Sequence, residues 1–170
     1  MVEQPSIVRA ALTVAVAVLV GAVVSPYLDF GWFSPEFAII AIVFAASGLR
    51  DLQGLLLGFF GGILSDALGG GVYLFGVGAI GGLISAALAV RYGMAWSRGA
   101  ERFLLAQLVA VSVAAYNVVQ VVALSMTGLD RPPLLGYTLS SILPDALLNG
   151  LLAFLVGGWL LKILRKERAQ

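Results

Sequence analysis

Residues 52–90 read LQGLLLGFFGGILSDALGGGVYLFGVGAIGGLISAALAV and form the stretch around which the rest of the chain is organised. About half of the chain's 21 glycines lie in it. So many glycines would weaken a helix in water, whereas in lipid a stripe of small residues lets two helix backbones approach closely. The stripes repeat every four residues and consist of Gly54, Gly58 and Gly62 in the first half and Gly78, Gly82 and Ala86 in the second.

This spacing predicts two transmembrane helices, at 52–68 and 72–90, that pack tightly at the centre of a bundle. The run between them contains the triple glycine 69–71, which is expected to turn the chain back. Asp66 is the lone carboxylate at this junction.

The composition is that of an integral membrane protein with a single domain, 1–170. Of the 170 residues, 61% are hydrophobic and 11% are charged, and the mean hydropathy is +1.03, far outside the range of soluble globular proteins. The sequence has neither Cys nor His, which excludes disulfides, thiolate catalysis, imidazole bases and the commonest zinc sites. The ten basic residues lie beside apolar segments, so no nucleic-acid surface is expected.

Six apolar segments predict an all-α bundle of transmembrane helices. The segment at 37–47 is short for a span: either 34–48 crosses a locally thin membrane, or it is re-entrant and covered by its neighbours. The first segment carries Ala11 and Ala15 at a spacing that could mark a helix-docking face. The expected helices are 7–24, 34–48, 52–68, 72–90, 103–126 and 139–164, with an interfacial loop between the first two.

Lys and Arg are distributed unevenly between the two sides of this arrangement. With the N-terminus inside, nine basic residues are cytoplasmic and only Arg131 is outside, so both ends are expected in the cytoplasm. The basic loop 91–102 and the basic tail are expected to bind anionic lipid or to fix this topology, with a cytoplasmic protein partner as the alternative. The nine are Arg9, Arg50, Arg91, Arg98, Arg102, Lys162, Arg165, Lys166 and Arg168.

Asp66 and Asp145 are the carboxylates closest to membrane depth, where an unpaired charge is costly. In a functional interpretation they form a site for a partner's basic residue, a cation or a proton. In a structural interpretation each lies at a helix end near the outer headgroups, where water satisfies it. Asp145 follows Pro144 at a helix start, where a carboxylate also complements the helix dipole.

Several polar side chains occur within the expected helices at 103–126 and 139–164. They could line a ligand cavity, or they could act as interhelical hydrogen-bonding groups worth about 0.6 kcal/mol each. These residues are Gln107, Tyr116, Asn117, Gln120 and Asn149.

The sequence offers no catalytic machinery. The triple glycine is not followed by the GK[ST] of a phosphate-binding loop. No paired nucleophile and base, no dinucleotide fingerprint and no cluster of metal ligands occurs. We therefore expect neither an enzyme nor a bound cofactor or metal.

Two segments, GFFGGILSDALGGGVYLFGVGAIGGLISAALA and SSILPDALLNGLLAFLVGGWLLKILRK, make the chain resemble the bacterial rod shape-determining MreD family. The resemblance covers nearly the whole chain and rests on its length, its six-helix layout, a G-x-x-x-G-x-x-x-D segment that ends in a glycine turn, and a last helix with a Pro followed by an Asn. The positions that carry it are Gly58, Gly62, Asp66, Gly69, Pro144 and Asn149.

The resemblance implies a non-enzymatic membrane subunit of the cell-elongation machinery. It would bind the single-span protein MreC and, through it, the MreB filament, the RodA glycosyltransferase and a penicillin-binding transpeptidase. The family is also similar in fold to the S components of energy-coupling-factor vitamin transporters, which implies an S-component-like bundle and supplies the alternative, a vitamin-binding subunit with an outward pocket.

We therefore expect a scaffold that acts by docking. In this hypothesis glycine-lined grooves accept a partner helix at close range. Acidic residues on the outer side steer a basic segment of the partner toward the protein. These acids are Asp29, Glu36, Asp130 and Asp145.

Overall fold

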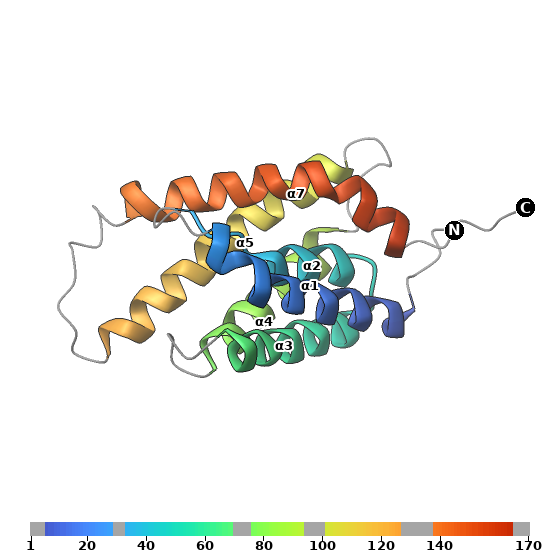
Figure 1. Ribbon diagram of the computed structural model, residues 1–170. Helices are drawn as coiled ribbons and strands as arrows, with labels where there is room; N and C mark the ends of the chain where they lie inside the picture. Colours follow the sequence, from blue (N-terminus) through green and yellow to red (C-terminus); the bar gives the residue numbers. More distant parts are fainter. Residues whose placement is uncertain (1–5, 29–32, 70–75, 94–100, 127–137, 165–170) are drawn as a thin grey trace, which may run out of the picture.

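The computed structural model describes residues 6–28, 33–69, 76–93, 101–126 and 138–164. Within these ranges the protein is all-helical, as expected (Figure 1). Four helices are long and apolar enough to cross a membrane, namely α1, α3, α5 and the segment Ser140–Leu164. The elements are α1 Ile7–Leu28, α2 Phe37–Ala46, α3 Asp51–Leu68, α4 Val77–Gly93, α5 Glu101–Ser125, a π-helical turn η1 Thr138–Ile142 and α7 Leu143–Leu164.

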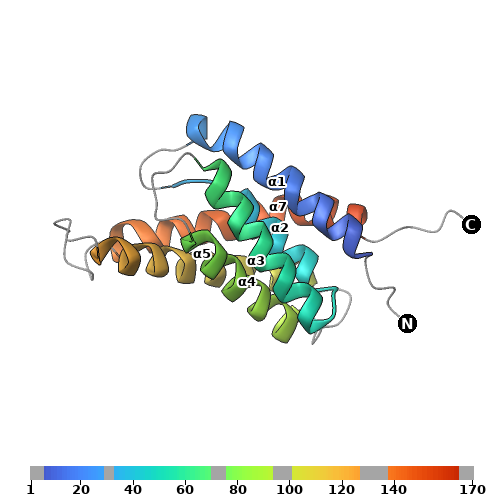
Figure 2. The same cartoon turned by 90° about the horizontal axis from the view of Figure 1, so that it is seen from below.

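Two pairs of helices form the frame of the bundle. α3 packs along α4, α5 packs along α7, and α4 also packs on α5, so that the two pairs are joined. α1 lies on the outside against α2 and α3 (Figures 1 and 2). The first residues of α1, α3 and α5 and the last residues of α4 and α7 lie at the same end of the bundle (Figure 1).

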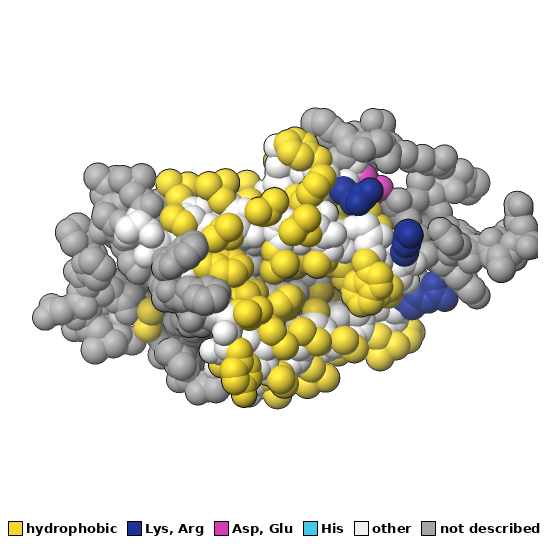
Figure 3. Space-filling model, turned by 45° about the horizontal axis from the view of Figure 1, so that its top comes forward, with side chains coloured by type: hydrophobic (Ala, Val, Ile, Leu, Met, Phe, Trp, Pro, Cys, Tyr) yellow, Lys and Arg dark blue, Asp and Glu magenta, His cyan; other side chains and the backbone are white. Residues whose placement is uncertain are grey.

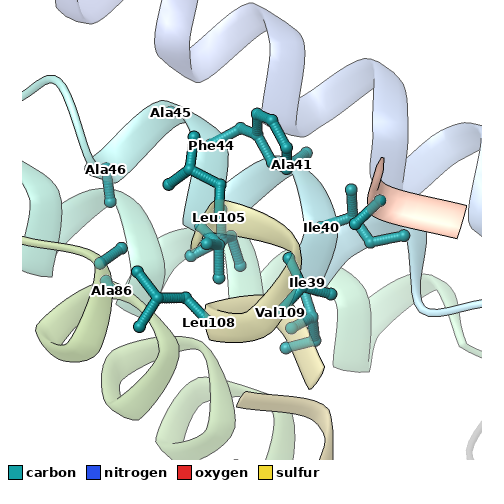
Figure 4. Close-up of a cluster of buried hydrophobic side chains, with 14 of the residues drawn as sticks. Ile39, Ile40, Ala41, Phe44, Ala45, Ala46, Ala86, Leu105, Leu108 and Val109 are labelled. Carbon is teal, nitrogen blue, oxygen red and sulfur yellow. The ribbon is translucent and has the colours of Figure 1, made fainter. Parts of the chain in front are cut away.

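The short helix α2 occupies the centre. Every residue from Ala38 to Ala46 is buried, and the α2 side chains face Ala86 of α4 and Leu105 and Val109 of α5 (Figure 4). The helix has 10 residues, so it is about 15 Å long, half the thickness of a bilayer's hydrocarbon core. One interpretation of the sequence required neighbouring helices to cover this short segment. The burial of α2 shows that they do.

Several expected helix boundaries differ from those observed. The short helix expected at 34–48 is α2 at Phe37–Ala46, because residues 33–36 are not helical. α1 continues past Val24 to Leu28, and contacts in this region hold the extra turn: the Ser25 hydroxyl donates to the Pro35 carbonyl at 2.9 Å. α4 begins at Val77, after Gly76 in the left-handed region at a φ of 103°. The beginning of the expected helix 72–90 and most of the triple-glycine turn lie outside the described residues.

Candidate functional site

The glycine stripes of α3 and α4 face each other. A methyl group on Gly58 would collide with the Gly82 carbonyl oxygen, and one on Gly62 would collide with the Gly78 carbonyl oxygen. All four glycines are buried. The close packing of these two helices on each other, as predicted from the spacing, is therefore present. The expected groove for a partner helix at these glycines is already filled by the protein itself, which corrects that part of the docking hypothesis.

Asp66 joins the last turn of α3 to the first turn of α4. Its two carboxylate oxygens accept the backbone N–H groups of Gly76 and Gly78, both at 2.8 Å. These N–H groups lie at the start of α4, where a helix has no partner of its own for them, and a negative charge there is also favourable for the helix dipole. Gly69, by contrast, ends α3 and donates its N–H to the Ser65 carbonyl at 2.8 Å.

A second polar cluster, the polar node, lies between the extended segment 33–36 and helices α5 and α7. Asn149 is its centre. The Asn149 amide oxygen accepts the Glu36 N–H at 2.8 Å, and its amide nitrogen donates to the Ser34 carbonyl at 3.0 Å. The same nitrogen reaches the Asp145 carbonyl at 3.0 Å and the Asp145 Oδ1 at 3.1 Å. The node consists of Ser34, Glu36, Asn117, Asp145 and Asn149.

Asp145 completes the node from the first turn of α7. Its Oδ1 accepts the Ser34 N–H at 3.0 Å, and its Oδ2 accepts the Asn117 side-chain amide at 2.8 Å. The residue is only 8% exposed. The interpretation in which water at the outer headgroups satisfies Asp145 is therefore wrong, and a carboxylate so enclosed cannot steer a partner from a distance. Its place in the first turn of α7 is favourable for the helix dipole, as expected.

The polar node provides hydrogen-bond partners for the backbone of the segment 33–36. The segment 33–36 is not helical, so its backbone groups lack the internal hydrogen bonds that a membrane environment demands. Asp145 and Asn149 supply them for Ser34 and Glu36, and the Ser25 hydroxyl supplies one for Pro35. A short helix can thus complete its passage through the bundle with an extended segment, because side chains from α7 replace the missing helical partners.

The residues expected to line a cavity are dispersed. Gln107 is exposed on the outer surface of α5. Tyr116 is buried against α4, where a methyl group on Gly81 would collide with its ring. Asn117 belongs to the polar node, and Gln120 is half-buried. The structure therefore brings Asn117 and Asn149 together through Asp145 but does not gather the whole set.

The basic residues gather at one end of the bundle. Among the described residues these are Arg9, Arg50, Arg91, Arg102 and Lys162, each at the start or end of a helix. Figure 3 shows blue side chains clustered at one end of an apolar surface. The expected outer residues Asp29, Asp130 and Arg131, like Arg98 and the tail beyond Leu164, lie outside the described ranges.

Within the described part of the chain, no group of three or more acidic, Cys or His residues could hold a metal ion. In the polar node, the side chains of Asn117, Asp145 and Asn149 and the backbone groups of Ser34 and Glu36 are joined by the hydrogen bonds above. Its geometry therefore supports a structural task.

Comparison with known protein families matches residues 5–167 to the family described as rod shape-determining protein MreD. The match covers every helix described above. No curated protein and no solved structure matches the chain.

Proposed function

The chain belongs to the MreD family of rod shape-determining proteins, and on that premise we propose that it is a non-enzymatic scaffold of the bacterial cell-elongation complex. Family membership implies a role in determining rod shape, and the family is generally non-enzymatic. The observation that carries the proposal is the extent of the match, from residue 5 to residue 167. The proposed partner is MreC and, through it, MreB, RodA and a penicillin-binding transpeptidase.

The proposed location is the inner membrane, with both ends in the cytoplasm. The described basic residues support this topology, because they lie at the end of the bundle where α1 begins and α7 ends (Figure 1). Positively charged residues favour the cytoplasmic side of a membrane protein.

The proposed docking surface is the outer face of α1. This helix has 22 residues, yet only 17% of its apolar window is buried, the smallest share of the four candidate spans. Ala11 is exposed on it and Ala15 is half-buried, so one pair of small residues remains at the surface. The glycines of α3 and α4 are occupied by each other. A single transmembrane helix such as that of MreC would find a small-residue contact surface at Ala11.

The test is capture of MreC from native membranes by tagged protein carrying Ala11→Phe. The matched control is Ala87→Phe, because Ala87 is also exposed on a lipid-facing helix but belongs to α4. Ala11→Phe is expected to lose most of the MreC, while Ala87→Phe captures as much as the wild type. Equal capture by both variants would contradict the α1 surface, and no MreC with the wild type would contradict the scaffold function.

A further inference from the structure

We propose that Arg102 and Lys162 form a binding site for the headgroup of an anionic phospholipid, on the face shared by α5 and α7. The proposal is independent of any protein partner. It rests on how the Arg102 side chain is placed, on the cation one helical turn away, and on the exposed apolar surface that leads to both.

The Arg102 side chain packs beside Gly158 of α7, next to Gly157. A methyl group on Gly158 would lie 2.8 Å from the Arg102 Nη1, 3.3 Å from Cζ and 3.6 Å from Cδ. A methyl group on Gly157 would lie 3.9 Å from the Arg102 Cγ. The guanidinium and much of its stem thus occupy a notch that exists because α7 has no side chains there. This contact places the guanidinium against α7 without neutralising it.

The notch lies inside the helical part of α7. Gly158 precedes the last helical residue, Leu164, by six positions, which corresponds to about 9 Å along the helix. Arg102 is exposed and makes no ion pair with any residue that the structure describes. A guanidinium that is exposed here and has no described ion-pair partner is free to bind an anion from its surroundings. Glu101 is its sequence neighbour, but adjacent helical residues do not face each other.

Lys162 and the neighbouring surface define the shape of the ligand. Lys162 is four residues after Gly158, so both lie on one face of α7, one turn apart. Trp159 beside them is 66% exposed, and Leu155 and Leu151 continue the exposed surface toward the middle of the helix. Two cations at the end of an apolar surface suit a phosphate on an acyl chain, and a tryptophan at that depth suits the membrane interface. We therefore assign the site to a lipid rather than to a free anion.

The test is quenching of Trp159 fluorescence by lipids with brominated acyl chains. Trp32→Phe and Trp96→Phe leave Trp159 as the one tryptophan of the chain. The protein is reconstituted in phosphatidylcholine vesicles that contain increasing fractions of brominated phosphatidylglycerol, or of brominated phosphatidylcholine for comparison. We expect phosphatidylglycerol to be preferred by about fivefold or more, the effect of one or two basic residues near a membrane surface.

Three variants distinguish a specific lipid-binding site from nonspecific attraction of anionic lipid by surface charge. Arg102→Gln is expected to remove most of the preference, and Gly158→Ala to weaken it, because the methyl group displaces the guanidinium while every charge remains. Arg91→Gln is the control, since it removes an exposed cation at the same end of the bundle but on α4. Equal quenching by the two lipids, an equal loss with Arg91→Gln, an unchanged preference with Gly158→Ala, or full competition by millimolar inorganic phosphate would each overturn the proposal.

Discussion

The contact between α3 and α4 can be tested by a single added methyl group, in the variant Gly62→Ala. The added carbon would lie 2.5 Å from the Gly78 carbonyl carbon and 2.7 Å from the Ala79 Cα, in addition to its collision with the Gly78 oxygen. Carbon atoms pack best at about 3.5–4.0 Å. Because all three neighbours are backbone atoms, no side-chain rotation can relieve the clash, and the two helices must move apart by about 1 Å.

The size of the effect follows from two opposing terms. Overpacking of a rigid core costs about 1–3 kcal/mol, and backbone neighbours place Gly62→Ala at the upper end. Replacing a helical glycine by alanine returns up to about 1 kcal/mol of helix propensity. The expected net loss is therefore about 2 kcal/mol of unfolding free energy. Moving α3 and α4 apart would also lengthen the hydrogen bond from the Gly78 N–H to the Asp66 carboxylate, which is 2.8 Å long in the wild type.

The assay is reversible unfolding in mixed micelles with increasing denaturing detergent. Gly21→Ala is the matched control, because Gly21 is also within an apolar helix but the nearest neighbour of its methyl group, the Phe37 Cβ, would be 3.7 Å away. This control should be as stable as the wild type or more stable by up to about 1 kcal/mol. If Gly62→Ala were as stable as Gly21→Ala, the close packing of α3 on α4 would be refuted.

Three further predictions concern Asp66, the polar node and the topology. Asp66→Asn keeps one acceptor of two and should lower the unfolding free energy by about 1.5–3 kcal/mol, the worth of one hydrogen bond to a charged group; a variant as stable as the wild type in the same detergent titration would be inconsistent with the cap. Asn149→Leu preserves the volume but leaves buried peptide groups unpaired at about 1–3 kcal/mol each, and hydrogen exchange at the Glu36 N–H should rise; unchanged exchange there would argue against the node. The chain has no Cys, so Ser6→Cys and Ser125→Cys, both exposed and at opposite ends of the bundle, report the orientation: an impermeant thiol reagent added to whole cells should label only Ser125→Cys, and the reverse pattern would invert the proposed topology.

The glycine contact could be predicted from the sequence because both sides of it are local patterns. A four-residue period places Gly54, Gly58 and Gly62 on one face of a helix, and a second such stripe follows after one turn. The period therefore predicts the packing of these two helices, but it does not tell whether a glycine groove is left for a partner helix. The structure pairs the two stripes with each other, so the glycines are not available to another protein.

The polar node could not be predicted from local patterns. Ser34 and Asn149 are 115 residues apart. The sequence around an amide side chain in an apolar helix does not show which distant group is its hydrogen-bond partner. One signal did exist in the sequence, namely that 37–47 is too short to span. A short helix must be completed by non-helical backbone, and such backbone needs polar partners from another helix. Asp145 and Asn149, in the first two turns of the last helix, are such partners.

Native mass spectrometry of the tagged protein, gently extracted from its own membrane, tests the scaffold function most directly because it records protein partners and retained small molecules together. We predict a complex with MreC and wall-synthesis subunits. A stoichiometric ligand of vitamin size, bound together with energy-coupling subunits, would contradict it and identify a transporter component instead.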